Sequence, residues 1–198
     1  MDEKFQALRK FHIERYLNFF DGEKNILDVG SHDDTFSLVA KKAGKRVRSI
    51  DCNPRNSNII KGNATDIPFG NGIFEGVLFS HVIEHMHLED AQKAISEIHR
   101  VLKPGGKLVL ATPHQSTFNR LFWEDSSHIM PYPVQVIEAL FLGKFETKLV
   151  KNRVRSNQIL LHALKNRFSN IYKMILPVSW YFPKAYRETI LVAEKIQS

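Results

Sequence analysis

The sequence has little cysteine and no long apolar run. Among its 198 residues there is one cysteine, Cys52, so no disulfide can form within the chain. A chain without disulfides suits a reducing compartment. No stretch approaches the ~20 consecutive apolar residues that a bilayer-crossing helix needs, and the first four residues, Met-Asp-Glu-Lys, do not resemble the apolar core of a secretory signal. We therefore expect a cytoplasmic protein, with peripheral attachment to a membrane as the alternative.

The composition is that of a globular domain with unevenly placed charge. Hydrophobic residues make up 43% and charged residues 25% of the chain, and its length fits one domain with a sizeable core. The net charge of +7 comes from residues 144–198, which contain 11 Lys and Arg against 3 acidic residues. Such asymmetry is typical of proteins with an anionic partner, such as a nucleic acid, a lipid headgroup or a phosphorylated substrate. It is equally compatible with a solvated basic face.

Residues 25–51 have the pattern of a nucleotide-binding βαβ unit. A short apolar run ends at Asp28 and Gly30, a polar turn leads into a helical pattern, and a second apolar run ends at Asp51. Glycine allows a sharp turn and a close ligand approach because it has no Cβ. Asp51 follows Asp28 by 23 positions, near the ~20-residue spacing at which an acid reaches a ribose hydroxyl. The stretch predicts a bound nucleoside, although either acid alone also fits a helix cap or a turn.

These residues resemble the first motif of the class I S-adenosylmethionine-dependent methyltransferases, of the type 11 group. The resemblance extends from about residue 24 to residue 114. The family's loop usually reads acid-x-Gly-x-Gly-x-Gly; this chain keeps Asp28 and Gly30 but has His32 and Asp34 at the second and third glycine positions. Residues 100–108, Arg-Val-Leu-Lys-Pro-Gly-Gly-Lys-Leu, are similar to the family's segment before its fifth strand and form the most specific part of the resemblance.

The resemblance implies a Rossmann-like α/β fold. We expect a three-layer sandwich with a mostly parallel seven-stranded sheet whose last strand is antiparallel, an N-terminal helix, and a helical insertion before the last strand. Residues 107–112 are predicted to form the fifth strand, directly after a turn at residues 103–106. The chain is predicted to be one domain with these parts: an N-terminal helix (1–22), a cofactor-binding core (23–114), a substrate-side loop, helix and strand (115–154), a basic aromatic insertion (155–187) and the last strand (188–198).

The resemblance also implies S-adenosylmethionine as cofactor, with S-adenosylhomocysteine as product. Residues 62–69 resemble the family's Gly-Asp-Ala-x-x-Leu-Pro-Phe, with Asn63 in place of the acid; its amide still offers an acceptor. Asp33 and Asp34 are interpreted as helix caps, and contact of one of them with the positive end of the cofactor is the alternative. The expected cofactor-binding residues are Asp28, Gly30, Ser31, His32, Asp51, Cys52, Asn63, Ala64 and Ser80.

Histidines gather after the predicted strands. Methyl transfer is a displacement in which an enzyme aligns the reactants, excludes water and, where needed, removes a proton. Imidazole titrates near neutrality, so His81, His85, His114 and His128 are all candidate bases. We choose His114 first and His85 second as catalytic residues. Each one also fits an ordinary surface or structural histidine.

The stretch His81-x-x-Glu84-His85 matches the inverted zinc-protease motif H-x-x-E-H. That motif needs a long helix, whereas this stretch directly follows a buried strand, so we do not expect a protease. Some small-RNA and ubiquinone O-methyltransferases have Glu-x-x-Glu-His here and hold a divalent metal with it, and this sequence resembles them at Glu84 and His85. Glu84 and His85 are interpreted as packing against or capping the next helix, as in metal-free members that also carry Glu-His, so no metal is expected. A site made of His81, Glu84 and His85 is the alternative, because imidazole can replace a carboxylate as a ligand for softer metals.

The leading hypothesis is a methyltransferase that modifies an oxygen or nitrogen of a small or lipid-linked acceptor. The basic insertion, with Trp180, Tyr181 and Phe182, suits contact with a membrane surface. The alternatives are an RNA methyltransferase, whose aromatic residues stack on bases, and a non-catalytic scaffold that has lost cofactor binding through His32 and Asp34. A nicotinamide-dependent enzyme is disfavoured because residues 30–35 lack the G-x-G-x-x-G fingerprint. The sequence does not indicate the oligomeric state.

Overall fold

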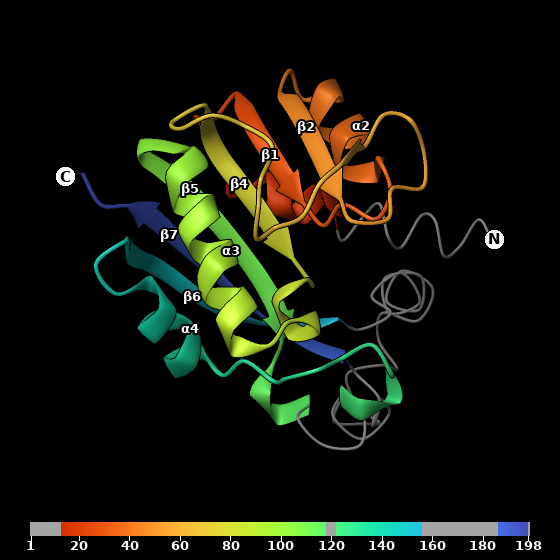
Figure 1. The fold of residues 1–198 in the computed structure, drawn as a ribbon, viewed down its shortest axis with the longest axis vertical. Helices are drawn as coiled ribbons and strands as arrows, with labels where there is room; N and C mark the ends of the chain where they lie inside the picture. The colour runs from red at the N-terminus through yellow and green to blue at the C-terminus, as the bar shows by residue number, and fades with distance from the viewer. Residues whose placement is uncertain (1–12, 118–121, 156–185, 198) are drawn as a thin grey trace, which may run out of the picture.

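The computed structural model describes residues 13–117, 122–155 and 186–197. Within these ranges, seven strands form one sheet in the order β3-β2-β1-β4-β5-β7-β6 (Figure 1). β7 pairs antiparallel with β5 and β6, and the other pairings are parallel. The predicted Rossmann-like sheet with an antiparallel last strand is confirmed. The strands are β1 (Asn25–Val29), β2 (Arg46–Asp51), β3 (Ile60–Lys61), β4 (Phe74–Ser80), β5 (Leu102–Pro113), β6 (Phe145–Arg155) and β7 (Tyr186–Lys195).

Helices cover both faces of the sheet because successive strand side chains point to opposite faces. On one face, Val77 and Leu108 pack in a cluster with Ile95 and Ile98 of a long helix. On the other face, the neighbouring strand residues pack with Tyr16 and the first described residues. Figure 1 shows α3 and α4 in front of the sheet. The helices are α2 (Thr35–Lys42), α3 (Leu88–Val101) and α4 (Val134–Phe141), with the short 3-10 helices η1 (Ile83–His85), η2 (Gln115–Thr117) and η3 (Phe122–Glu124).

The junction between α3 and β5 differs from the expectation. The strand was predicted to begin at Lys107 after a separate turn, but β5 begins at Leu102, directly after the last residue of α3. The backbone of Leu102 is already extended, with ψ 139°. The register between β4 and β5 shifts between Phe74 and Gly76. The segment containing Pro104 thus ends the helix as predicted, but it also forms the first part of the strand.

The two acids interpreted as caps at the start of α2 have different roles in the structure. Asp33 Oδ1 accepts a hydrogen bond from the backbone N–H of Thr35 at 3.0 Å. Asp34 occupies the N-cap position but makes no side-chain capping bond. Its Oδ2 accepts a hydrogen bond from Asn58 Nδ2 at 3.0 Å instead. The capping interpretation is therefore right for Asp33 and wrong for Asp34, whose side chain ties α2 to the segment before β3.

Two predicted parts lie largely outside the described residues. Of the N-terminal helix expected over residues 1–22, residues 13–17 are helical and residues 1–12 are outside the description. The insertion expected over residues 155–187 falls almost entirely in the range 156–185, which is also outside it. Among the helices that the structure describes, none combines the length and the apolar character needed to cross a membrane.

Candidate functional site

The predicted site residues gather at one edge of the sheet. β1, β2 and β4 run parallel and in register, with Val29 beside both Ile50 and Phe79. Their carboxyl ends therefore meet at the same edge, which is where open α/β sheets bind ligands. In Figure 1 this edge is at the bottom of the view. The expected cofactor-binding residues lie in or directly after the ends of these strands and of β3, as the sequence predicts.

The loop after β1 follows a backbone path that glycine favours. Gly30 has φ 75°, and a Cβ placed on it would lie 2.3 Å from Val82 Cγ2. His32 also has a positive φ, 55°, at the position where the resembled family has its second glycine. Such a conformation costs a residue with a Cβ roughly 1–2 kcal/mol. The loop therefore keeps the glycine-type path with a histidine in it, and the side chain of His32 is exposed.

Asp51 connects this loop to the turn after β2. Its Oδ2 accepts a hydrogen bond from the backbone N–H of His32 at 2.9 Å, and its Oδ1 accepts one from the N–H of Asn53 at 2.8 Å. The backbone N–H groups of Gly30 and Ser31 donate to the carbonyl oxygen of Ile50 at 2.9 and 3.1 Å. A carboxylate oxygen has a second lone pair, so these bonds leave Asp51 able to accept a ribose hydroxyl.

Polar groups around this loop fit a nucleoside cofactor. Within the described part of the chain, the Ser31 Oγ is buried and has no hydrogen-bond partner, and such a group calls for a partner that completes the site. Asn63 Oδ1 accepts the N–H of Thr65 at 3.1 Å, and Ala64 next to it is 7% exposed. Cys52 is exposed. The residues present therefore fit a nucleoside cofactor such as S-adenosylmethionine.

The end of β4 carries a network of buried polar side chains. His81, with φ 56°, follows the last residue of β4. Its Nδ1 lies 3.0 Å from Glu84 Oε1, and its Nε2 lies 3.1 Å from Glu188 Oε2. The hydroxyl of Tyr16 donates to the same Glu188 oxygen at 2.8 Å. Thr112 Oγ1 donates to Glu84 Oε2 at 3.2 Å. The network connects β4, β5, β7 and the first described helical residues.

Glu84 and Glu188, the two carboxylates of this network, have no exposed surface. Burial by itself raises the pKa of the Glu84 carboxyl group, but the hydrogen bond and the charge of His81 outweigh this effect and lower the pKa. Glu84 is therefore held as a carboxylate. Sequence reasoning found His81 and Glu84 but missed Glu188, Tyr16 and Thr112, because only the folded sheet brings these distant residues together.

The two chosen bases have different hydrogen-bond partners. His85, in η1, points its Nδ1 at the carbonyl oxygen of Ser127, 2.9 Å away. His114 follows β5, and its Nδ1 accepts the backbone N–H of Ser116 at 3.0 Å. A carbonyl only accepts, so Nδ1 of His85 carries the proton and Nε2 holds the lone pair; in neutral His114 the arrangement is reversed. These two residues are therefore in opposite tautomers.

His128 lies beside His85. Their ring centroids are 4.9 Å apart, and His128 also stacks on Phe122 at 4.4 Å. The backbone N–H groups of Ile129 and Met130 donate to the carbonyl oxygen of Glu84 at 2.8 and 3.2 Å. The loop after η3 is thus fastened to η1, which brings His128 to the histidine that the sequence places 43 residues earlier.

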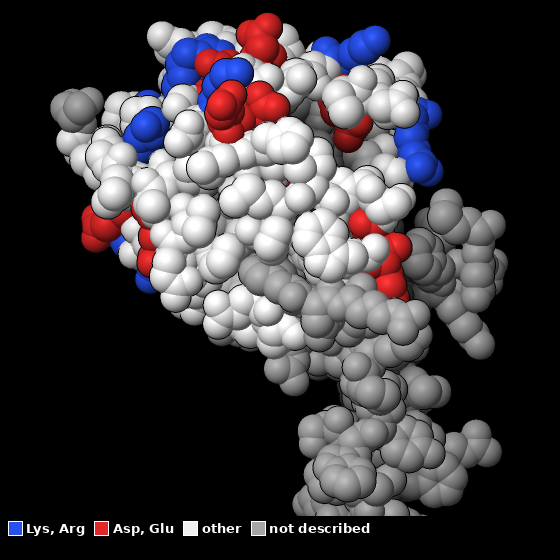
Figure 2. All heavy atoms as spheres, turned by 60° about the horizontal axis from the view of Figure 1, so that its bottom comes forward, with Lys and Arg blue, Asp and Glu red and all other residues white. Residues whose placement is uncertain are grey.

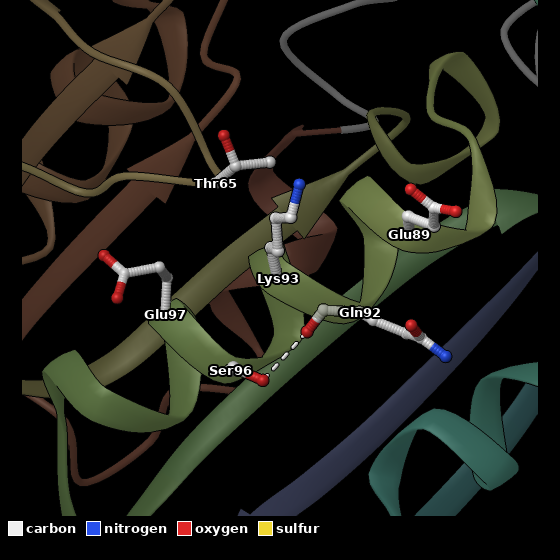
Figure 3. Close-up of a pocket in the computed structure, with 6 residues that line it drawn as sticks. All are labelled: Thr65, Glu89, Gln92, Lys93, Ser96 and Glu97. Atoms are coloured by element: carbon white, nitrogen blue, oxygen red, sulfur yellow. Dashed lines mark hydrogen bonds between the residues drawn. The ribbon is translucent and has the colours of Figure 1, made fainter.

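A shallow hollow of about 470 Å³ lies on the outer side of α3 (Figure 3). Glu89, Lys93 and Glu97 are among its lining residues, and Thr65 faces them from the loop after β3. The hydrogen bond drawn in it runs from Ser96 Oγ to the carbonyl oxygen of Gln92 at 2.9 Å. None of the lining residues is a predicted site residue, so we place the candidate site at the carboxyl edge of the sheet.

The surface at this edge is mostly uncharged in its described part. Figure 2 looks toward it and shows Lys, Arg, Asp and Glu mainly around the rim. Trp123 is 56% and Ile129 40% exposed, both in the segment that carries His128. Exposed apolar side chains near a polar site are typical of surfaces that receive an apolar ligand.

Comparisons with known proteins cover the core of the fold, including the loop after β1. Residues 27–110 match a family described as a methyltransferase domain. An uncharacterized methyltransferase of Synechocystis sp. is 31% identical over 137 residues, which cover 64% of this chain and 58% of that protein. A demethylmenaquinone methyltransferase of Renibacterium salmoninarum is 39% identical over 92 residues, which cover 46% of this chain and 35% of that protein. A ubiquinone/menaquinone biosynthesis C-methyltransferase of Blochmanniella floridana is 29% identical over 113 residues, which cover 56% of this chain and 42% of that protein.

A solved structure shows the same fold. The crystal structure of a SAM-dependent methyltransferase from Archaeoglobus fulgidus superposes with a TM-score of 0.68 at 17% identity, and the match covers 96% of this chain and 94% of that one. The aligned regions of the curated relatives span less than two thirds of those proteins. Residues 27–110 thus match a methyltransferase domain, and the chain shares the fold of a solved SAM-dependent methyltransferase.

Proposed function

We propose that the chain transfers a methyl group from S-adenosylmethionine to a small or lipid-linked acceptor. The observation that carries this proposal is the loop after β1, which lies within the residues that match a methyltransferase domain and keeps the glycine-type backbone, with φ 75° at Gly30 and 55° at His32. When bound, the cofactor supplies a methyl group on a positively charged sulfur. The chain's own part is to orient the cofactor with Asp51 and Ser31, to exclude water and to take up a proton where the acceptor releases one.

The geometry favours His85 over His114 as the base. A base needs a lone pair directed at the proton that it removes. His85 donates from Nδ1 to Ser127, so its Nε2 lone pair is the one available, whereas the Nδ1 lone pair of His114 already accepts the Ser116 N–H. We therefore assign proton removal to His85 and a positioning role to His114, which reverses the order proposed from the sequence.

An apolar acceptor fits the uncharged surface at the carboxyl edge. Trp123 and Ile129 are exposed there, and two of the relatives are named for demethylmenaquinone and for ubiquinone and menaquinone biosynthesis. We keep an oxygen or nitrogen, the atoms of the leading hypothesis, as the first candidate for the methylated atom. One relative is named a C-methyltransferase, which favours a carbon as the second candidate.

Calorimetry with S-adenosylmethionine and S-adenosylhomocysteine tests cofactor binding. We expect saturable micromolar binding of both compounds to the full chain, and a loss of at least ~10-fold in D51N, which removes the carboxylate that faces the ribose. The matched control is E89Q, an exposed acid on α3 away from the loop. Absence of binding at millimolar ligand would leave the scaffold hypothesis in place of the enzyme.

Transfer of a labelled methyl group tests the acceptor. The full chain is incubated with methyl-labelled cofactor and either a demethylated quinone or a catechol, and mass spectrometry locates the label on carbon or on oxygen. A label on oxygen supports the first candidate and a label on a ring carbon the second. Transfer to RNA alone would contradict the small-acceptor proposal.

A further inference from the structure

Three side chains that ligate metals meet beside the end of β4. One ligand atom from each of Glu84, His85 and His128 lies within 4.8 Å of the other two. Glu84 and His85 belong to η1, whereas His128 comes from the loop after η3. Glu84 is buried and both histidines are half-buried, so the cluster is a defined arrangement in the protein rather than a group of free surface residues.

The two histidines are oriented as metal-bound histidines are. The Nδ1 of His85 lies 2.9 Å from the carbonyl oxygen of Ser127, and the Nδ1 of His128 lies 2.7 Å from that of Phe122. Each Nδ1 must therefore donate its proton, which leaves the Nε2 lone pair of each ring for a ligand. Histidines that bind metals almost always donate their other ring N–H to a carbonyl or carboxylate in this way.

Glu84 is held in place by partners of its own. His81 approaches its Oε1, Thr112 donates to its Oε2, and the backbone of Ile129 and Met130 donates to its carbonyl oxygen. The last two bonds also fix the loop of His128 relative to η1. A carboxylate oxygen that accepts one hydrogen bond has a second lone pair for a cation. The three ligands are thus positioned before any ion binds.

We propose that Glu84, His85 and His128 bind one divalent transition-metal ion. Two imidazoles and a carboxylate suit Zn²⁺ or Co²⁺ better than Mg²⁺, which prefers oxygen ligands. Asp125 Oδ2 lies 3.8 Å from His128 Nε2 and is within reach as a fourth ligand. This site differs from the alternative raised by the sequence, because His81 turns both ring nitrogens to carboxylates and His128 takes its place. The bound ion fastens the loop of residues 122–130 to the end of β4 and occupies the Nε2 lone pair of His85, so proton removal by His85 belongs to the ion-free protein.

Metal binding by the full chain tests the proposal without any assay of activity. The protein is stripped with a chelator and titrated with Zn²⁺, Co²⁺ and Mg²⁺ by calorimetry, with Co²⁺ absorption spectra to report nitrogen ligands. We expect one equivalent of Zn²⁺ or Co²⁺ and at least ~100-fold weaker Mg²⁺ binding. H85Q and H128Q should each weaken Zn²⁺ binding by ~100-fold or more, and T112V, which removes a partner of Glu84, by about 10-fold.

The matched control is H87Q, since His87 is exposed and lies two positions after His85. It should keep the stoichiometry and affinity of the unmodified protein. The proposal is overturned by no Zn²⁺ binding, by equal binding in H128Q and the unmodified protein, or by an equal loss in H87Q. Because Glu84 is buried and its replacement risks unfolding, the two histidine variants decide the question, each checked by circular dichroism.

Discussion

At the residue scale, the loop after β1 shows how a histidine occupies a glycine position. The backbone N–H of His32 still donates to Asp51, and its φ of 55° keeps the path of the loop. The sequence showed that a glycine was missing at this position. It did not show that the backbone would nevertheless adopt the left-handed conformation, because that conformation is imposed by the bonds to Asp51 and Ile50.

Replacing His32 by glycine should stabilise the protein slightly. H32G removes the cost of the left-handed conformation but makes the unfolded chain more flexible, so we expect a gain of up to ~1 kcal/mol in the free energy of unfolding, measured with urea. H32A keeps the backbone cost and removes the imidazole. If the imidazole crowds the cofactor, both variants bind S-adenosylhomocysteine more tightly; weaker binding by both would show that the imidazole contributes to affinity.

Gly30 should tolerate no side chain. A Cβ at this position would lie 2.3 Å from Val82 Cγ2, so we expect G30A to lose about 2–4 kcal/mol of unfolding free energy through overpacking and backbone strain. Gly44 is the control: its φ is 74° and nothing lies within 4 Å of a Cβ there. G44A should therefore lose only the backbone contribution, roughly 1 kcal/mol. Equal losses in the two variants would contradict the clash with Val82, and V82A should partly rescue G30A.

At the scale of elements, α3 holds the loop that carries Asn63 and Ala64. The guanidinium of Arg100 donates to the carbonyl oxygens of Ile67 and Phe69 at 2.9 and 2.7 Å. Glu97 Oε2 accepts both the Arg100 Nη2 and the backbone N–H of Ile67, at 2.7 and 2.8 Å. The hydrogen bond from Arg100 lowers the pKa of Glu97, which keeps this pair ionised.

Loss of Arg100 should loosen that loop. R100Q removes charge-assisted bonds to two carbonyls, so we expect a loss of about 2–3 kcal/mol in unfolding free energy. If residues 63–64 hold the adenine, cofactor affinity should fall as well. K93Q is the control, because Lys93 forms an exposed pair with Asp90 at 3.5 Å, which should contribute under ~0.5 kcal/mol. An R100Q variant as stable as K93Q would show that the bonds to the loop add nothing.

The pattern of α3 was predictable from its sequence, whereas its junction with β5 was not. Apolar residues at helical spacing identify α3 because its buried side, with Ala91, Ile95 and Ile98, must face the sheet. The start of β5 at Leu102 depends on pairing with Phe74 in β4. That contact joins residues far apart in the chain, so no local pattern contains it.

At the scale of the whole molecule, one carboxylate links three parts of the sheet. Glu75 Oε2 accepts the backbone N–H groups of Lys24 and Asn25 at 2.7 and 3.1 Å, and Lys103 Nζ lies 3.0 Å from its Oε1. The hydrogen bond from the backbone N–H of Lys24 has the largest effect and the one from the side chain of Lys103 the second largest, and they lower the pKa of Glu75 to about 2. Glu75 therefore joins the starts of β1, β4 and β5.

This carboxylate should make stability depend on acid pH. Because the folded-state pKa is below the unfolded value of 4.5, the contribution of Glu75 is complete above that value and disappears as the pH falls toward 2. Urea unfolding at a series of pH values should show a smaller loss between pH 5 and 2.5 in E75Q than in the unmodified protein. The exposed E89Q variant should follow the unmodified curve; identical curves for E75Q and the unmodified protein would refute this role.

The sequence by itself determined the fold and the edge of the sheet where the candidate site residues gather. Two short apolar runs separated by a helical pattern, with Gly30 and Asp51 at the ends of the runs, indicate a parallel βαβ unit, because apolar patterning and turn chemistry are local properties of the chain. The tertiary structure decided which groups meet at that edge. It turned His81 toward Glu188 and brought His128 to His85, since the partners of a buried polar group are chosen by packing across the sheet and by the need to satisfy each hydrogen bond.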